Sequence, residues 1–188
     1  MENILKSPLT EEDKDYKIID NFLPKNIFDE LQKFMLPQAN NFDPNMEQIY
    51  WSYTPGVAHM EDAFKKWEIY YFVHMIYIND AIVSPLYNNE FVGHIRRGAD
   101  IKSLMRMKAN MFPHTETLVE HDPHIDLPYS HKGAIFSINT CDGYTKLEDG
   151  TKIDSVANRL LLFDASKLHS STTTTNQSVR VNININFF

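Results

Sequence analysis

The last eleven residues of the chain, 178–188 with the sequence SVRVNININFF, alternate almost strictly between apolar and polar side chains. This alternation predicts a β-strand, because successive side chains of a strand point to opposite faces of the sheet. The polar face holds one arginine followed by three asparagines: Arg180, Asn182, Asn184 and Asn186. A polar row behind a wholly apolar face is typical of a strand that packs on helices on one side and lines a polar cavity on the other.

The sequence before this strand predicts a β-rich core from about residue 104 to residue 188. Three segments have the composition of buried or half-buried strands: LMRMKANMF at 104–112, GAIFSINT at 133–140 and RLLLFDA at 159–165. Two Asp-Gly pairs, Asp142-Gly143 and Asp149-Gly150, lie between β-prone segments and predict hairpin turns. Short strands separated by turn signals predict a sandwich or a barrel.

The sequence from about residue 16 to residue 103 predicts helices that support this β core. A short strand at 16–19 precedes a helix that starts near Pro24, because apolar residues then recur at helical spacing. Residues 63–78 also show helical spacing, with His74 as a satisfied core histidine, although their aromatic side chains favour a strand as well. No change in composition indicates a second domain, so we expect a single domain over residues 1–188.

Composition argues against several classes of function. The formal net charge is -7, and clusters of lysine and arginine that would contact nucleic-acid phosphates are missing from the sequence. The longest apolar stretch, WEIYYFVHMIYI, is too short to span a membrane, and the charged N-terminal segment does not resemble a signal peptide. Cys141 is the only cysteine, which fits a reducing compartment. We therefore expect a cytoplasmic protein without membrane or nucleic-acid partners.

Potential metal ligands are concentrated just before the strand GAIFSINT. His124 and Asp126 are two residues apart, so a strand would present an imidazole and a carboxylate on the same face. His169 follows the buried strand RLLLFDA, and a rolled-up sheet can return it beside this pair. Two histidines and one carboxylate on one side of a metal are the ligand set of non-haem Fe(II) oxygenases.

Other histidines offer alternative ligands. His114 and Glu116 form an H-x-E pair with the same spacing, and short motifs of this kind often match by chance. His121 and His131 have no carboxylate two residues later, so we expect them in a loop or around the site.

Arg180 is the candidate for binding an anion. The planar guanidinium matches the geometry of a carboxylate, so a dicarboxylate co-substrate can chelate iron at one end and meet Arg180 at the other. Arg106, Lys108 and Asn110 share one face of their predicted strand, and any of them can line the same pocket. For Asn110 the alternative is a buried side chain that satisfies backbone groups.

This set, His124-x-Asp126, His169 and Arg180 within RVN, resembles the 2-oxoglutarate- and Fe(II)-dependent dioxygenases. More closely, the chain is similar to the prolyl-4-hydroxylase-like branch and its short phage-encoded members, a likeness that extends to YKIIDNFLP, MRMKANMFP and NRLLLFDASKLHSS. The resemblance implies a mostly β protein with N-terminal helices: a double-stranded β-helix, which is a cupin-like jelly roll, with helices packed on its major sheet.

The resemblance also implies an activity and a site. His124, Asp126 and His169 would be the catalytic Fe(II) ligands, and Arg180, Asn182 and Asn110 would bind 2-oxoglutarate. The reaction would convert 2-oxoglutarate and O₂ into succinate and CO₂ while a substrate C–H bond, such as that of a peptidyl prolyl residue, is hydroxylated. The primary substrate, a peptide or a metabolite, is not specified by these motifs. If the chain is phage-encoded, it would act in the host cytoplasm.

Two other classes of function remain open from the sequence. The fold can serve as a cupin-like binding module without turnover, or the histidine-rich segment can hold zinc for hydrolysis. Zinc hydrolysis would require a nearby general base and would give Arg180 no role. Iron-dependent consumption of 2-oxoglutarate separates the dioxygenase from both alternatives.

Overall fold

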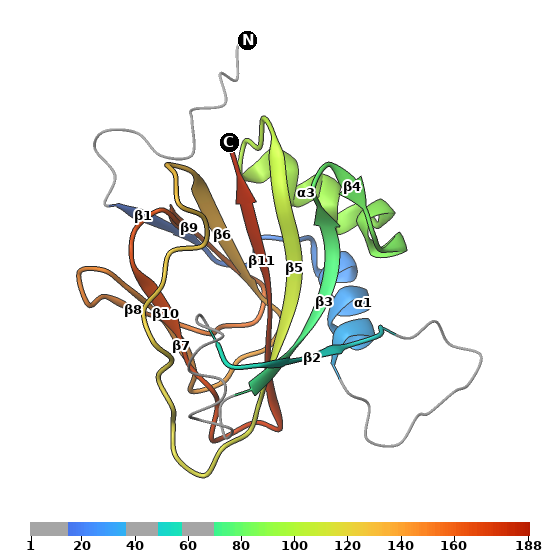
Figure 1. Cartoon of the computed structure of the whole chain (residues 1–188). Coiled ribbons are helices and arrows are strands. Elements are labelled where there is room, and N and C mark those ends of the chain that lie inside the picture. The colour runs from blue at the N-terminus through green and yellow to red at the C-terminus, as the bar shows by residue number, and fades with distance from the viewer. Residues whose placement is uncertain (1–14, 37–48, 58–69) are drawn as a thin grey trace.

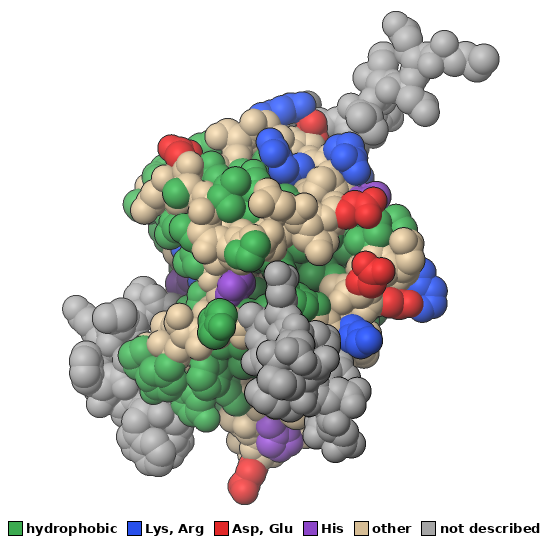
Figure 2. All heavy atoms as spheres, turned by 90° about the vertical axis from the view of Figure 1, so that its right-hand side faces the viewer, with side chains coloured by type: hydrophobic (Ala, Val, Ile, Leu, Met, Phe, Trp, Pro, Cys, Tyr) green, Lys and Arg blue, Asp and Glu red, His purple; other side chains and the backbone are tan. Residues whose placement is uncertain are grey.

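A computed structural model of the chain describes residues 15–36, 49–57 and 70–188, and the other residues are grey in Figure 1 and Figure 2. Within these ranges the chain is mostly antiparallel β-structure with two α-helices. The elements, in chain order, are β1 (Tyr16–Ile19), α1 (Lys25–Met35), β2 (Ser52–Pro55), β3 (Tyr70–Ile78), β4 (Ala81–Ile82), the 3-10 helix η1 (Pro85–Asn88), α3 (Glu90–Gly98), β5 (Leu104–Pro113), β6 (Lys132–Ser137), β7 (Tyr144–Leu147), β8 (Lys152–Asp154), β9 (Arg159–Asp164), β10 (His169–Ser171) and β11 (Val179–Phe187).

The strands form two sheets. The larger sheet has the order β1-β9-β6-β11-β5-β3-β2, with β4 paired to β3, and the smaller sheet has the order β10-β7-β8. Among the described strands, β2 with β3, β3 with β4 and β7 with β8 are consecutive pairs, whereas the other pairings bring together strands that do not follow each other in the sequence. Large antiparallel sheets with this connectivity are consistent with a jelly roll.

Strand β11 lies between β5 and β6 and has two buried faces, as its alternating sequence predicts. Its apolar side chains, among them Val181 and Ile183, are fully buried in one hydrophobic core with Phe28 of α1 and Phe91 of α3. Both helices lie on the same side of the large sheet in Figure 1. The polar side chains of β11 are buried as well, on the opposite face of the strand.

The two polar rows of β5 and β11 stand opposite each other across the sheet. The register pairs Arg106 with Asn186, Lys108 with Asn184, Asn110 with Asn182, and Phe112 with Arg180. Directly opposed residues of antiparallel strands lie within contact distance on the same face. The polar row that the C-terminal sequence predicts on β11 therefore lies beside a second row of side chains from β5.

The N-terminal region departs from the prediction. The predicted helix at 63–78 is wrong over residues 70–78, which form β3, while residues 63–69 lie outside the described residues. Pairing of β3 with both β2 and β5 outweighs the helical spacing, because aromatic and β-branched side chains pack well on a pleated surface. The ring nitrogens of His74 lie 3.0 Å from Tyr50 O and 2.8 Å from Ser84 Oγ, so this histidine is satisfied.

The two described α-helices differ in how well the sequence predicts them. Helix α1 starts directly after Pro24 and buries Ile27, Phe28, Leu31 and Met35, in agreement with its spacing. Helix α3 was not predicted; it starts after Asn89, whose side chain accepts a hydrogen bond from the Phe91 N–H and so caps the helix. In the described part of the chain, no helix has the length and apolar character needed to cross a membrane.

Of the two Asp-Gly pairs, one forms the predicted hairpin. Asp149-Gly150 joins the antiparallel strands β7 and β8, and Gly150 adopts a positive φ of 85°. The prediction for Asp142-Gly143 is wrong, because the strands on either side, β6 and β7, belong to different sheets. The Asp142 carboxylate instead accepts hydrogen bonds from Thr174 Oγ1 at 2.7 Å and the Thr175 N–H at 2.9 Å. This segment thus carries the chain from the large sheet to the small one.

Candidate metal centre

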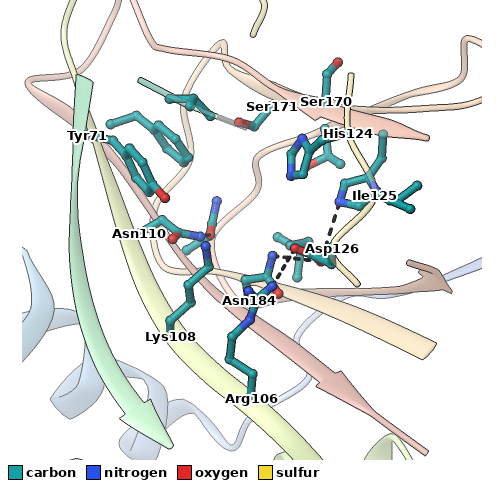
Figure 3. A pocket seen from close by; sticks show the side chains of 16 residues that line it. Tyr71, Arg106, Lys108, Asn110, His124, Ile125, Asp126, Ser170, Ser171 and Asn184 are labelled. Atoms are coloured by element: carbon teal, nitrogen blue, oxygen red, sulfur yellow. Dashed lines mark hydrogen bonds and ion pairs between the residues drawn. The ribbon is translucent and has the colours of Figure 1, made fainter. Parts of the chain in front are cut away.

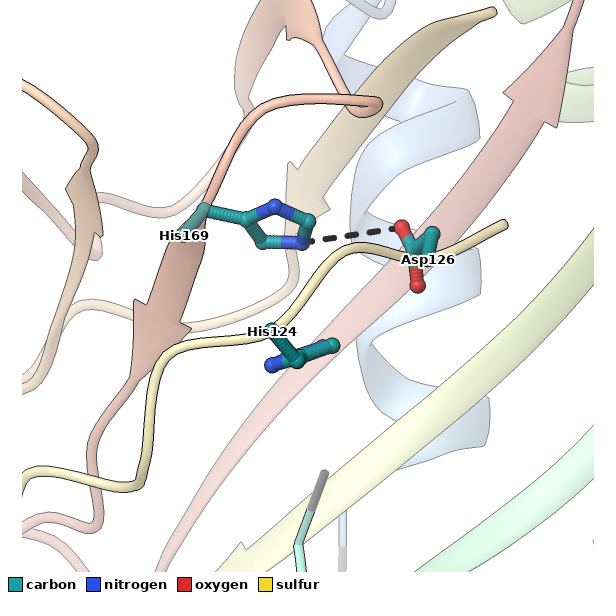
Figure 4. A group of neighbouring side chains, drawn as sticks. All are labelled: His124, Asp126 and His169. Atoms are coloured by element: carbon teal, nitrogen blue, oxygen red, sulfur yellow. Dashed lines mark ion pairs between the residues drawn. The ribbon is translucent and has the colours of Figure 1, made fainter. Parts of the chain in front are cut away.

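Three of the predicted ligands meet in one place (Figure 4). His124, Asp126 and His169 each offer one ligand atom, and these atoms lie within 4.8 Å of one another. Backbone hydrogen bonds in both directions, His124 N to His169 O at 2.9 Å and His169 N to His124 O at 3.0 Å, hold the two histidines side by side. His124 forms an isolated β-bridge with β10 and does not belong to a longer strand, and Asp126 N donates to Ala165 O at 3.3 Å, so these backbone contacts position the H-x-D pair.

The hydrogen bonds of His169 leave one ring nitrogen free for a metal. Its Nδ1 lies 3.0 Å from Lys167 O and must donate there, because a carbonyl oxygen only accepts. In the neutral ring Nε2 therefore carries a lone pair; it is buried without a hydrogen-bond partner and lies 3.6 Å from Asp126 Oδ2. A neutral His169 and the Asp126 carboxylate present lone pairs to the same buried space, which a bound cation would stabilise, so the arrangement fits a metal ion.

Several donors fix the Asp126 carboxylate. Arg106 Nη2 donates to Oδ1 at 2.6 Å, and the side-chain amides of Asn186 and Asn184 donate to Oδ2 at 3.0 Å and 3.3 Å. Burial alone would raise the pKa of Asp126, but interactions with His169, Arg106 and Asn186 hold this pKa well below its usual value. The carboxylate is therefore anionic at neutral pH.

His124 is neutral at the same pH. Burial, and next the neighbouring charge of His169, lower the pKa of His124 to about 4. Its Nδ1 is buried without a hydrogen-bond partner. A neutral imidazole retains the lone pair that metal coordination requires.

A second layer of side chains supports this group. His131 lies with Nδ1 2.7 Å from Tyr129 O and Nε2 3.1 Å from Asn186 Nδ2, so it orients the amide that holds Asp126. The roles of Arg106, Asn184 and Asn186 as partners of Asp126 were not predicted from the sequence. Their shared strand faces place them in one pocket, but only the folded chain shows that the loop carrying Asp126 crosses over them.

The triad borders a cavity of about 190 Å³ between the two sheets (Figure 3). Most of its lining is polar, and the side chains come from β3, β5, the segment before β6, the small sheet and β11. The lining residues are Val57, Tyr71, Arg106, Lys108, Asn110, Phe112, His124, Ile125, Asp126, Ile135, Thr145, His169, Ser170, Ser171, Asn182 and Asn184.

The residues predicted to bind 2-oxoglutarate lie in or next to this cavity. Asn110 and Asn182 line it, and Asn110 Nδ2 donates to Asn182 Oδ1 at 3.0 Å. Arg180 is only 1 % exposed and lies behind the lining, with Nη1 donating to Thr172 O at 3.0 Å and Nη2 donating to Thr145 Oγ1 at 3.1 Å. Thr145 itself lines the cavity, so the guanidinium lies one side chain away from the free space.

Arg180 has no carboxylate partner among the residues that the structure describes. Burial lowers the pKa of Arg180 to about 10, and the group stays charged at neutral pH. Its Nε is buried without a hydrogen-bond partner, and the Phe112 ring lies 5.6 Å from the guanidinium carbon. A buried cation without a counter-charge is costly, so this position fits an anionic ligand.

The rival histidines lie outside the triad. His114 and Glu116 are exposed, and His114 Nδ1 lies 3.2 Å from Gln177 O. His121 is buried with Nδ1 2.8 Å from Ser171 Oγ, and burial, followed by the charge of Arg180, lowers the pKa of His121 to about 4. Within the described residues, the only group of three or more metal-ligating side chains is the triad.

Gly143 provides room for Arg180, and this predicts a measurable cost of substitution. A Cβ atom at this position would lie 2.6 Å from Arg180 Cδ and 2.6 Å from the Thr173 carbonyl oxygen. Gly143→Ala is therefore expected to lower the free energy of unfolding by about 1–3 kcal/mol, measured by chemical denaturation. As a control, Gly93→Ala in α3 would meet only the flexible end of Arg97 and should not destabilise the helix. Equal stability of the two variants would contradict this close packing.

Comparison of the sequence finds no matching family model and no matching curated protein. Comparison of the structure finds similar folds. The epimerase SnoN in complex with Fe³⁺, α-ketoglutarate (2-oxoglutarate) and nogalamycin RO has a TM-score of 0.63 at 11% identity, over 93% of this chain and 78% of that chain. The α-ketoglutarate-dependent carbocyclase SnoK from nogalamycin biosynthesis has a TM-score of 0.54 at 13% identity, over 96% and 84% of the two chains.

A prolyl hydroxylase from Trichoplax adhaerens, in complex with a peptide of hypoxia inducible factor, also has a TM-score of 0.54, at 14% identity over 93% of this chain and 83% of that chain. Identities this low show the fold alone. The chain therefore shares the fold of these α-ketoglutarate-dependent enzymes and of the prolyl hydroxylase.

Proposed function

We propose that the chain is a 2-oxoglutarate- and Fe(II)-dependent dioxygenase that holds its iron through His124, Asp126 and His169. The observation that supports this most strongly is the convergence of one ligand atom each from His124, Asp126 and His169 within 4.8 Å, with His169 Nε2 buried without a hydrogen-bond partner and 3.6 Å from Asp126 Oδ2. Two imidazoles and one carboxylate are the ligand set that suits non-haem Fe(II).

The other residues of the pocket have distinct roles in this proposal. Arg106, Asn184 and Asn186 hold the Asp126 carboxylate in one orientation. Arg180 supplies the charge for the distal carboxylate of 2-oxoglutarate, with Asn110 and Asn182 beside it. The iron, when bound, supplies the chemistry by which 2-oxoglutarate and O₂ yield succinate and CO₂ and one oxygen atom enters a substrate C–H bond.

For the primary substrate, we propose a class of molecule and not a single compound. One structural neighbour is a prolyl hydroxylase in complex with a peptide, and two others belong to nogalamycin biosynthesis. We propose hydroxylation of a peptide side chain, such as a prolyl residue, or of a metabolite. Four features stay predictions from the sequence. They are a single domain over residues 1–188, helices packed on the major sheet of a jelly roll, the similarity to phage-encoded members, and a cytoplasmic location.

The pocket gives less support to zinc-dependent hydrolysis. Such a reaction requires a general base near the metal-bound water. Among the described residues that line the pocket, Asp126 is the only acid, and Arg106 and two asparagine amides already occupy its oxygens. The hydrolase would also leave the buried charge of Arg180 without a function.

Metal exchange tests the proposed activity. Protein supplied with Fe(II), O₂ and 2-oxoglutarate should form succinate, slowly alone and faster with its substrate, and chelation of the metal should stop this turnover. Reloading with Fe(II) should restore succinate formation, whereas Zn(II) should not, because zinc has no redox chemistry. Succinate formation that is equally fast in the chelated, zinc-loaded and iron-loaded protein would contradict the proposal. No succinate formation in the iron-loaded protein would favour the binding module.

A further inference from the structure

Lys108 is a cation in the pocket that the proposed reaction does not use. It lies on β5 between Arg106 and Asn110 on the same face, and its side chain extends into the cavity in Figure 3. No hydrogen bond or ion pair of the Lys108 amine occurs within the described part of the chain. Its nearest described aromatic contact is the Tyr71 ring, whose centroid lies 5.7 Å from Nζ.

The charged form of Lys108 persists despite its surroundings. Burial, and next the charge of Arg106, lower the pKa of Lys108 to about 8, so the protonated amine still predominates at pH 7. A half-buried ammonium without a counter-charge among the described residues is costly, and a bound anion would remove this cost. The amine therefore fits an anionic ligand on geometric and electrostatic grounds.

The charges in and behind the pocket do not balance, even with the proposed cofactors bound. Among the described residues, Arg106, Lys108 and Arg180 carry three positive charges against the single carboxylate of Asp126. A divalent metal and the doubly negative 2-oxoglutarate cancel each other. Within the described part of the chain, two positive charges thus remain unmatched at this pocket.

Lys108 and Arg180 serve different ends of this pocket. Lys108 pairs in register with Asn184, and Arg180 pairs with Phe112, so the two cations are four positions apart along the β5–β11 ladder. Four residues of a strand span about 13 Å. Lys108 stands at the triad end of this ladder, because its partner Asn184 donates to Asp126, so the distal carboxylate of 2-oxoglutarate at Arg180 does not neutralise the Lys108 amine.

We infer that the primary substrate carries an anionic group, a carboxylate or a phosphate, and that the Lys108 amine binds this group beside the triad. The inference rests on the proposed function, since it assigns the distal carboxylate of 2-oxoglutarate to Arg180. Lys108 would act as a specificity-determining residue: it pairs with the substrate and takes no part in holding the metal or the co-substrate.

The test uses pairs of small molecules that differ by one anionic group. Wild-type protein, Lys108→Met and Lys108→Arg are loaded with Mn(II) and 2-oxoglutarate, and binding is measured by calorimetry. Glutamate against glutamine probes a carboxylate, and AMP against adenosine probes a phosphate. Methionine keeps the length of the side chain beside Tyr71 and removes its charge, and arginine keeps the charge.

In at least one pair, the anionic member should bind wild-type protein about tenfold more tightly than its neutral partner. This preference should disappear in Lys108→Met and persist in Lys108→Arg, while the affinity for 2-oxoglutarate stays within about threefold of wild type in both variants. The pair that shows the preference identifies the carboxylate or the phosphate.

Three results would overturn the inference and leave the proposed function intact. The first is the absence of a charge preference in both pairs, and the second is a preference that persists in Lys108→Met. The third is a loss of more than about tenfold in the 2-oxoglutarate affinity of Lys108→Met, which would assign Lys108 to the co-substrate. Wild-type protein that fails to bind 2-oxoglutarate in the presence of Mn(II) would contradict the proposed function itself, and the inference with it.

Discussion

Replacement of Arg180 by alanine is expected to weaken the binding of 2-oxoglutarate by roughly two to four orders of magnitude. Arg180 is 1 % exposed and has no carboxylate partner in the described part of the chain, so its removal would leave the distal carboxylate of 2-oxoglutarate buried without a counter-charge. Truncation of one member of such a pair typically costs about 3–5 kcal/mol. Anaerobic titration of the metal-loaded variant with 2-oxoglutarate measures this loss.

Two controls separate this effect from a structural one. Arg180→Lys keeps the charge but loses the planar fork, so its loss of affinity should be smaller than that of Arg180→Ala. Metal binding should stay nearly unchanged in both variants, because no triad ligand is removed. Since Arg180 also donates to Thr172 O and Thr145 Oγ1, the unfolding free energy of each variant should be measured alongside. Wild-type affinity for 2-oxoglutarate in a folded Arg180→Ala protein would refute this role.

Replacement of His169 by alanine should abolish both tight metal binding and succinate formation. His169 contributes the unpartnered Nε2 that faces Asp126, and the remaining His124 and Asp126 cannot enclose a metal on three sides. Loss of a residue that merely supports a metal ligand typically costs 10–100-fold in affinity, so the loss of a ligand should exceed about 100-fold. Equilibrium dialysis against Mn(II) or anaerobic Fe(II) measures the affinity.

His114→Ala is the matched control for this variant. His114 is exposed and belongs to the rival H-x-E pair, so its removal should leave metal binding and turnover at the level of the parent protein. Normal turnover in His169→Ala, or a loss of metal in His114→Ala, would show that the iron is held elsewhere.

The sequence predicts β11 and its two faces correctly, because strand periodicity and burial lead to the same alternation there. The spacing of His124 and Asp126 also points to a shared face, but their meeting with His169 depends on a backbone bridge to β10. Such a bridge joins segments distant in sequence, and only the topology of the sheets creates it. The position of His169 after a buried strand suggested it as the third ligand, and the resemblance to a known family implied the same residue.

The errors have physical causes of the same kind. Residues 70–78 match a helical pattern and a strand pattern equally, and pairing with β2 and β5 decides between them. Asp142-Gly143 has the local sequence of a hairpin, yet the flanking strands pair with other partners. The ion pair between Arg106 and Asp126 brings together a strand and a loop that only the folded chain places in contact.

The central claim is that His124, Asp126 and His169 together hold iron, and anomalous diffraction at the iron absorption edge tests it most directly. Crystals grown without oxygen in the presence of Fe(II) and 2-oxoglutarate should show one strong anomalous peak. The peak should lie about 2.0–2.3 Å from a ring nitrogen of each histidine and an oxygen of Asp126, the range for such ligands at divalent sites. An iron peak beside His114 and Glu116, or no peak at the triad, would contradict the account.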